Sequence, residues 1–520
     1  MRSAPDAVSS AGPSRLEGVH AAGRVRSALR ARMRACAVSA LAALAAVPAL
    51  AKDDGGLREC RIAGFAHPVQ CGSLRRPLDP ARPEGAHIDV HYVVVPALAR
   101  RKLPDPVFFL AGGPGQSAID VAPFVMPLFD RLQNRRDIVF VDQRGTGRSA
   151  PLACGDARGE PFNDASDPER QLARIRRCLA GLEASAATGG AEGLRHFTTT
   201  VAMQDLDAVR RALGASRIDV VGASYGTRAA LEYQRQFPGS VRRMVLDGVA
   251  PPDMVLVASL STDSQAALDA LFDACLRHAA CARLHPSLRD HWHAVLAGLP
   301  RDVVTPDPLT GERMPLHLTR EGLLGAVRGP LYAPALAAAL PAAIDAAAAG
   351  RYDGLVGLGS LLTARRSVRV ALGMHFSVVC AEDVPRVPLA TDRPGADFGD
   401  DFARFYARAC DGWPRGDVPA AFYAVGRSAA PVLLLSGGAD PVTPPRHGAR
   451  VAAALGSLAR HVIVPEAGHG VMSIGCMSDV VYRFIDAADD AAALAVDAGC
   501  AAHVPRPLAF EPVARAEALR

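Results

Sequence analysis

The chain has 520 residues, of which 58 are basic and 53 acidic, so its formal net charge is +5. Residues 1–51 hold seven arginines and two acidic residues, and without them the chain has 51 residues of each sign and a net charge of zero. This balance argues against nucleic acid or an acidic membrane surface as a partner. The length exceeds that of an ordinary domain and favours one large core with an inserted second lobe.

The amino terminus has the pattern of an export signal. Five arginines between positions 24 and 34 precede the Ala-rich run Ala35–Leu50, which is too short to span a bilayer comfortably. The run ends in a small-residue cleavage pattern at Ala51. We therefore expect residues 1–51 to be a signal peptide that starts at Met1 or Met33. The product would be periplasmic or secreted, without a stable membrane anchor.

Ten cysteines follow residue 51, and an even number in an exported chain suggests disulfide bonds. Sequence alone does not fix their connectivity. The spacings favour sequential pairing: Cys60 with Cys71, Cys154 with Cys178, Cys275 with Cys281, Cys380 with Cys410, and Cys476 with Cys500. Because the chain has no C-x-x-C pair or tight Cys/His cluster, we expect no metal site.

From Cys60 to Asp247 the pattern alternates between strands and helices. Period-2 alternation of apolar residues over 88–94 predicts an early, half-exposed strand. Short continuous apolar runs are typical of parallel strands covered on both faces. They occur at Val107–Leu110, Ile138–Val141, Ile218–Val221 and Val241–Leu246. Helices are predicted at Val201–Leu213 and Thr227–Phe237, which gives a doubly wound, mostly parallel α/β pattern.

A helical segment then interrupts the sheet. Residues 251–425 are rich in Ala and Leu, with helical stretches such as Ala333–Ala348 and few strand-like runs. Strands return at Val432–Leu435 and Val462–Val464, before a helix-like Asp479–Ala487. We therefore expect a core at 52–250, an inserted helical lid at 251–425, completion of the core at 426–505, and a polar tail at 506–520.

The pentapeptide Gly222-Ala223-Ser224-Tyr225-Gly226 lies between a predicted strand and a predicted helix. This order is that of a nucleophile elbow, in which small residues let strand and helix approach and expose the serine hydroxyl. The alternative is a glycine turn without chemistry. Other parts of a hydrolytic site elsewhere in the chain favour the elbow, with Ser224 as the nucleophile.

A serine hydroxyl needs a base, and the base needs an acid that fixes its tautomer. Asp440 follows the glycines that end one late strand, and His469 follows the next strand between two glycines. Their separation accommodates one helix, Pro445–Leu455, and one strand. Asp247, at the end of another strand, is the alternative acid. The other available histidines are His375, His447 and His461.

The negative charge that develops on the substrate needs two preorganised backbone N–H donors. We expect one from Tyr225, immediately after the nucleophile. The second is expected from Gly113, with Gly112 as the alternative, in the Gly/Pro-rich loop after Val107–Leu110.

With these residues assembled, the chain resembles the proline iminopeptidase and tripeptidyl aminopeptidase group of α/β-hydrolases. The resemblance implies the α/β-hydrolase fold, no cofactor, and cleavage of short units from free peptide amino termini. It also implies a carboxy-terminal segment that completes the core. The matching stretches are Gly112–Ser117, Val141–Ser149, Gly222–Thr227, Leu246–Val249, Asp440–Pro444 and Gly468–Gly470.

Recognition of a free amino terminus requires an anion for the α-ammonium group, because a buried unpaired charge is costly. The family places acidic residues in the lid, where this chain has Glu382, our first choice, and Asp383, our second. The alternative is a solvated pair at a turn. Many proline iminopeptidases have His before Gly-Gly-Pro-Gly, whereas this chain has Ala111, which favours the tripeptidyl branch.

The leading prediction is therefore an exported serine exopeptidase that acts on peptides, with an open oligomeric state. A carboxylesterase with the same triad is the second hypothesis, since acyl transfer to water does not distinguish amide from ester. A non-catalytic binding module on this fold is disfavoured because no triad position is missing.

Overall fold

The computed structural model describes residues 56–155, 167–308, 310–364 and 369–510. The predicted signal peptide and the end of the predicted tail, residues 511–520, lie outside these ranges. Within them, no helix is both long enough and apolar enough to cross a membrane.

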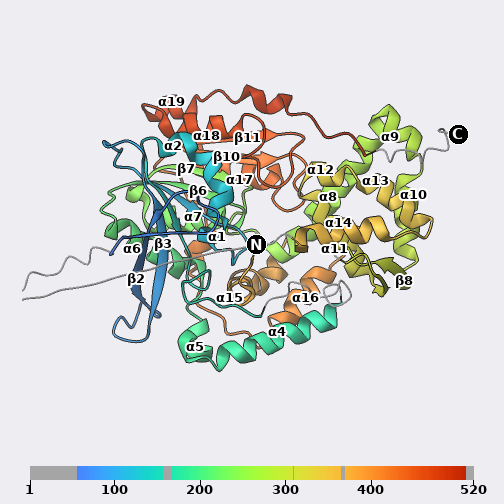
Figure 1. Ribbon diagram of the computed structural model, residues 1–520, viewed down its shortest axis with the longest axis horizontal. Coiled ribbons are helices and arrows are strands. Elements are labelled where there is room, and N and C mark those ends of the chain that lie inside the picture. Colours follow the sequence, from blue (N-terminus) through green and yellow to red (C-terminus); the bar gives the residue numbers. More distant parts are fainter. Residues whose placement is uncertain (1–55, 156–166, 309, 365–368, 511–520) are drawn as a thin grey trace, which may run out of the picture. The chain divides into compact units, whose positions relative to one another are not determined.

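The chain folds around one nine-stranded sheet (Figure 1) with the order β1-β2-β3-β5-β4-β6-β7-β10-β11. From β5 to β11 all neighbours are parallel, whereas β1, β2 and β3 pair antiparallel to their neighbours. The predicted mostly parallel sheet is confirmed, and β1 and β2 are additions to it. The strands are β1 (Arg58–Cys60), β2 (Val69–Pro77), β3 (His87–Val95), β4 (Val107–Leu110), β5 (Ile138–Val141), β6 (Ile218–Ala223), β7 (Val241–Asp247), β10 (Val432–Gly437) and β11 (Ala459–Val464).

The central strands are buried on both faces, as their continuous apolar runs predict. Along β4, Phe108 and Leu110 belong to one core cluster, while Val107 and Phe109 belong to a second cluster on the opposite face. Successive side chains of a strand point to opposite faces, so a strand between two layers must be apolar at every position.

The helices that cover the sheet include those predicted at Val201–Leu213 and Thr227–Phe237, each shifted slightly. Helix α6 begins two residues earlier than predicted, where the side chain of Thr198 caps it, and α7 begins directly after Ser224. The covering helices are α1 (Ala118–Val125), α2 (Asp130–Gln133), α4 (Pro168–Glu183), α5 (Gly190–Leu194), α6 (Thr199–Ala212), α7 (Tyr225–Gln236), α17 (Pro445–Leu455), α18 (Met477–Asp486) and α19 (Asp490–Leu494).

The segment between β7 and β10, called the insert below, is mainly helical. It also contains a hairpin of β8 (Arg301–Pro306) and β9 (Arg313–Leu318), which the sequence analysis missed. Its helices are α8 (Leu256–Arg277), α9 (Ala279–Leu284), α10 (Leu288–Ala297), α11 (Arg320–Leu331), α12 (Pro334–Ala337), α13 (Leu340–Ala348), α14 (Asp353–Ala364), α15 (Leu372–Glu382) and α16 (Asp401–Ala409).

One predicted helix of the insert is wrong. The stretch Ala333–Ala348 forms two helices, α12 and α13, rather than one. Pro341 lies in the first turn of α13, where its missing N–H costs nothing, whereas inside one long helix it would remove a backbone hydrogen bond.

The insert has two kinds of packing. Its helices α8, α10, α11, α13 and α14 share a core cluster of their own, which includes Leu268, Trp292 and Ile344. Helix α15 instead contributes Met374 and Phe376 to the main core cluster beneath the sheet. This second contact brings residues of the insert against the loops at the carboxyl edge of the sheet.

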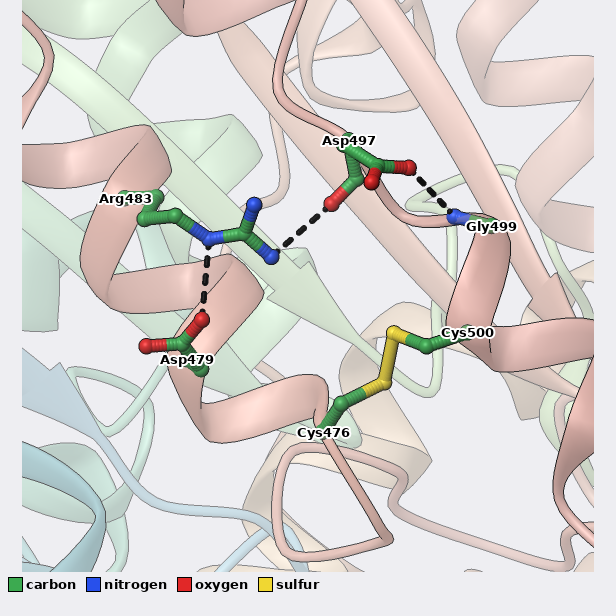
Figure 2. The surroundings of a disulfide bond; sticks show 6 residues. All are labelled: Cys476, Asp479, Arg483, Asp497, Gly499 and Cys500. Carbon is green, nitrogen blue, oxygen red and sulfur yellow. Dashed lines mark hydrogen bonds and ion pairs between the residues drawn. A yellow bond between two sulfur atoms is a disulfide. The ribbon is translucent and has the colours of Figure 1, made fainter.

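All five disulfides predicted from the spacing are present, and each joins cysteines in sequential order. Figure 2 shows the bond between Cys476, before α18, and Cys500 near the carboxy terminus. Beside it, Arg483 donates to the carbonyl oxygen of Asp497 at 3.0 Å and forms an ion pair with Asp479 at 2.9 Å. The disulfide and these polar contacts fasten the last described segment to α18.

The double variant Cys476→Ser/Cys500→Ser should be less stable than the wild type. The bond closes a loop between positions 24 residues apart, so its loss should lower the free energy of unfolding by about 3 kcal/mol through the entropy of the unfolded chain. Urea denaturation measures this change. An unchanged unfolding midpoint would show that this bond contributes nothing.

Candidate active site

Ser224 occupies a strained turn between β6 and α7. It has φ 56° and ψ −124°, and it is one of two non-glycine residues with positive φ in the described chain. Its N–H donates to the carbonyl of Asp247 at 2.8 Å, and its carbonyl accepts from the Thr227 hydroxyl at 2.6 Å. Such strain persists only where the surroundings enforce it, and it is found most often at functional sites.

The two glycines of the pentapeptide are required by close packing. A Cβ added at Gly222 would lie 2.4 Å from the carbonyl oxygen of Gly226, and one added at Gly226 would lie 2.1 Å from that of Leu110. Strand, helix and the neighbouring β4 therefore meet without space for a side chain. This contact leaves the Ser224 side chain half-exposed at the carboxyl edge of the sheet.

Asp440 and His469 form a hydrogen-bonded pair at the same edge. Nδ1 of His469 lies 2.8 Å from Oδ2 of Asp440. The other oxygen, Oδ1, accepts from the amides of Val442 and Thr443 at 2.8 and 2.9 Å. With the carboxylate as its acceptor, Nδ1 carries the proton and Nε2 is left as the basic nitrogen, which is the tautomer that a general base needs.

The electrostatics of this pair favour a charged carboxylate. Burial alone would raise the pKa of Asp440, but His469 and the backbone amides outweigh it, so the pKa lies below its usual value. Burial alone would lower the pKa of His469, but the Asp440 carboxylate outweighs this effect and raises it. Each partner therefore stabilises the charged form of the other.

Asp247, the alternative acid, has a different role. Its carboxylate accepts from the amides of Val471 and Met472, at distances between 2.8 and 3.1 Å. It therefore holds the loop that follows His469 rather than the imidazole itself. A Cβ added at the next residue, Gly248, would lie 3.2 Å from Cε1 of His469. Ser224 is thus hydrogen-bonded to the main chain at the end of β7, and His469 packs against the same end.

The loop expected to bind the oxyanion lies against the nucleophile. A Cβ added at Gly112 would lie 3.2 Å from Cβ of Ser224. The N–H of Gly112 donates to Oε1 of Gln116, so this alternative donor is already engaged. Gly113 has φ 111°, a conformation that favours glycine. Tyr225 is the first residue of α7, where an N–H has no acceptor within the helix.

The remaining histidines lie elsewhere. His447 bonds Asp263 of α8 at 2.8 Å, and His461 lies 3.0 Å from the Ser436 hydroxyl. His375 of α15 lies between the carbonyl of Pro114, at 3.2 Å, and the hydroxyl of Tyr406, at 2.7 Å. Burial lowers the pKa of His375, so its neutral form donates from Nδ1 to the oxyanion loop.

Glu382 and Asp383 are buried rather than solvated, so the alternative of an exposed pair is wrong. The guanidinium of Arg228 donates to both oxygens of Asp383, at 2.9 and 3.2 Å. Glu382 accepts from the amide and hydroxyl of Thr199, at 2.8 and 3.0 Å, and lies 3.7 Å from Arg228. Burial raises the pKa of Glu382 to about 7, although Arg228 and Thr199 oppose the rise.

The Asp142–Ser149 stretch braces the oxyanion loop. The carboxylate of Asp142 accepts from the Ser117 hydroxyl at 2.6 Å and from the amide of Ile119 at 3.1 Å, at the start of α1. Arg144 is fully buried and forms an ion pair with Asp205 at 2.8 Å.

Sequence reasoning missed three residues that contact the predicted site. The hydroxyl of Thr443 donates to Oδ2 of Asp440 at 2.8 Å and lies 3.1 Å from Nδ1 of His469. The carbonyl of Tyr332, after α11, accepts from the amide of His469 at 2.9 Å, and the two rings pack edge to face at 5.2 Å. His375 is the third. Only the position of Thr443, three residues after Asp440, gave a local signal.

Among the described residues, no group of three or more His, Cys, Asp or Glu side chains is arranged to hold a metal ion. The arrangement of Ser224, His469 and Asp440 supports nucleophilic attack by a serine on an acyl carbon, with a histidine as the general base.

Replacing the two candidate acids should separate their roles. Asp440→Asn should lower kcat on an activated acyl substrate by a factor on the order of 10⁴, because the imidazole loses the partner that fixes its tautomer. Asp247→Asn keeps a carbonyl oxygen for the loop amides and should lower kcat by less than about tenfold. The opposite ranking of the two kcat values would identify Asp247 as the acid.

The pH profile should report the Asp440–His469 pair. Only neutral His469 accepts a proton, so kcat/KM should fall as the pH drops through its pKa, which lies above the usual 6.5. Asp440→Asn removes the carboxylate that raises the pKa of His469, so the acid limb of the residual activity should move to lower pH. An acid limb that does not move would contradict the coupling of the two groups.

Two family models match this chain, one before and one after residues 274–394. Residues 105–273 match the family described as alpha/beta hydrolase fold, and residues 395–492 match the family described as TAP-like protein. Together they include the nucleophile turn, the acid and the histidine.

Three curated relatives are similar to this chain over part of their lengths. The tripeptidyl aminopeptidase of Streptomyces lividans is 32% identical over 193 residues, which is 36% of this chain and 36% of that protein. Serine protease Hip1 of Mycobacterium tuberculosis is 33% identical over 192 residues, 35% of this chain and 36% of that protein. A probable proline iminopeptidase of Streptomyces coelicolor is 31% identical over 208 residues, 40% of this chain and 50% of that protein. The chain thus matches half or less of the length of each relative. The sheet order and both family matches agree, so the chain has the α/β-hydrolase fold, and residues 395–492 are similar to TAP-like proteins.

Proposed function

We propose that this chain is an exported serine peptidase that releases short units, tripeptides in the leading case, from free amino termini of peptides. The observation that carries the proposal is that a strained, half-buried Ser224 and the hydrogen-bonded Asp440–His469 pair lie at the same edge of the sheet. The similarity to relatives named tripeptidyl aminopeptidase and serine protease supports the peptide substrate.

The reaction follows from the roles of these groups. Oγ of Ser224 attacks the scissile carbonyl while Nε2 of His469 takes its proton, and His469 then gives the proton to the leaving amine. Asp440 stabilises the imidazolium that forms. The N–H groups of Gly113 and Tyr225 hold the oxyanion, and water releases the acyl group in a second cycle of the same steps.

The buried cluster beneath Tyr225 supports recognition of an amine. Two carboxylates, Glu382 and Asp383, face the single cation Arg228, so one negative charge is left over when both are ionised. The Tyr225 hydroxyl bonds Thr199 at 2.6 Å, and Thr199 in turn bonds Glu382. Because Asp383 is already held by Arg228, Glu382 is the better candidate for the α-ammonium group.

The insert, residues 251–425 with core segments on both sides, acts in this proposal as a lid over the triad. Export is supported by five disulfides, which persist mainly in oxidising compartments. The signal peptide that would direct it lies outside the described residues.

A carboxylesterase remains the second candidate, and one observation favours it. Glu382 and Asp383 are both buried and already hydrogen-bonded, so neither presents an unoccupied carboxylate to an incoming amine. An esterase would use the same triad and would need no such anion.

The test is hydrolysis of a fluorogenic tripeptide amide with a free or an acetylated amino terminus. Wild type should prefer the free amine by about tenfold or more in kcat/KM, and Ser224→Ala should lose all turnover. The preference should weaken as the pH falls below about 7, because Glu382 then takes up a proton. Titration of His469 affects both substrates equally, so it cancels in the ratio of their kcat/KM values.

Glu382→Gln should abolish the preference for the free amine, and Glu169→Gln, at an exposed carboxylate on α4, is the matched control. Equal rates on free and acetylated peptides in the wild type, or cleavage of simple esters only, would support the esterase instead.

A further inference from the structure

Arg328 is a cation of the insert without a carboxylate partner. It lies in the last turn of α11 and is half-buried, and its Cζ stands 5.2 Å from the ring centroid of Phe402 on α16. Among the residues that the structure describes, no acidic side chain forms an ion pair with it. A partly desolvated charge in such a position is costly unless an anion binds it.

One helical turn after Arg328, Tyr332 lies on the same face of α11 and touches the histidine loop. Its carbonyl accepts the amide of His469, and its ring meets the imidazole edge to face. Arg328 is therefore four residues from a residue that contacts the proposed catalytic base.

On its other side, Arg328 faces the helix that carries Phe402 and Tyr406, whose rings pack at 4.7 Å. The hydroxyl of Tyr406 bonds His375, which bonds the carbonyl of Pro114 in the oxyanion loop. The charge of Arg328 thus acts on two tyrosines, one touching the histidine loop and the other linked through His375 to the oxyanion loop.

The charges agree with this placement. Burial raises the pKa of both tyrosine hydroxyls, and the positive charge of Arg328 opposes the rise at Tyr332 and at Tyr406. The other charged groups that act on them are carboxylates: Asp440 on Tyr332, and Asp383 on Tyr406. Both of these carboxylates have nearer partners, His469 and Arg228 respectively.

Two other arginines that contact the site region are neutralised by carboxylates. Arg228 is bound by Asp383, and Arg446 forms ion pairs with Asp263 and Asp392, each at 2.8 Å. Arg328, by contrast, has no ion-pair partner among the described residues, so its charge is left for a ligand. Its planar fork suits two parallel hydrogen bonds to a carboxylate.

We propose that Arg328 binds a carboxylate of the peptide substrate; this rests on the proposed peptidase function. Two parts of a peptide supply such a carboxylate: the carboxy terminus of a short peptide, and an acidic side chain close to the scissile bond. Flanking aromatic rings exclude water from the guanidinium and strengthen its interaction with either anion.

The experiment compares three peptides with one common, neutral amino-terminal half. The first ends in a free carboxylate, the second in the amide, and the third is the amide with one Glu beside the scissile bond. Wild type should cleave at least one of the carboxylate-bearing peptides with kcat/KM about tenfold above the neutral amide. The better of the two identifies the source of the carboxylate.

In Arg328→Gln this ratio should fall to less than about threefold, while Arg328→Lys should keep part of it because the charge remains without the planar fork. Arg277→Gln, at an exposed arginine on α8, is the matched control and should keep the full ratio. Taking the ratio within each variant cancels any change in general activity. If Arg328→Gln does not fold, the reduced ratio in Arg328→Lys is the readout.

Equal kcat/KM of the wild type for all three peptides would overturn the inference while leaving the peptidase function intact, as would an unchanged ratio in both Arg328 variants. Hydrolysis of a simple ester with no cleavage of any of the peptides would overturn the proposed function, and with it the peptide carboxylate.

Discussion

The geometry of the site depends on the hydrogen bonds of Asp247, at the end of β7. Its carbonyl accepts the amide of Ser224, and its carboxylate accepts the amides of Val471 and Met472, the latter 225 positions away in the chain. The nucleophile turn and the histidine loop are therefore both hydrogen-bonded to this one residue. Because the carboxylate is buried, separating the histidine loop from it would leave a charge without partners, which costs several kcal/mol.

The insert contacts each loop of the proposed site through a different helix. From α8, the Ser264 hydroxyl donates to the carbonyl of Pro441, beside Asp440. After α11, Tyr332 accepts from His469, and from α15, His375 contacts the oxyanion loop at Pro114. A change in the packing of these helices would therefore alter the acid, the base and the oxyanion donors together. The insert therefore helps to set the geometry of the proposed site.

Charge is distributed differently from what the sequence suggests. Glu382 and Asp383 look like a free acidic pair, yet Arg228, more than 150 positions earlier, neutralises one of them. Arg328 looks like one of many surface arginines in the sequence, yet it stands between aromatic rings without an ion-pair partner among the described residues. The sequence shows which residues are charged, whereas the fold determines which partners lie close enough to neutralise them.

Local patterns were sufficient for the elements whose cause is local. Continuous apolar runs predicted the parallel strands because both faces of such strands are buried, and glycine positions predicted the turn at Ser224 because a Cβ at Gly222 or Gly226 would clash. The β8–β9 hairpin was not predicted, because its two strands pair with each other outside the main sheet and contain no continuous apolar run.

The sequence by itself determined the central strands of the sheet, the nucleophile turn and the candidates for acid and base, since spacing and period encode these. Only the tertiary structure decided between Asp440 and Asp247, buried Glu382 and Asp383 against Arg228, and brought Arg328, Tyr332 and His375 to the catalytic loops. The physical reason is that hydrogen bonds and ion pairs between segments far apart in the sequence produce no periodic pattern of residues along the chain.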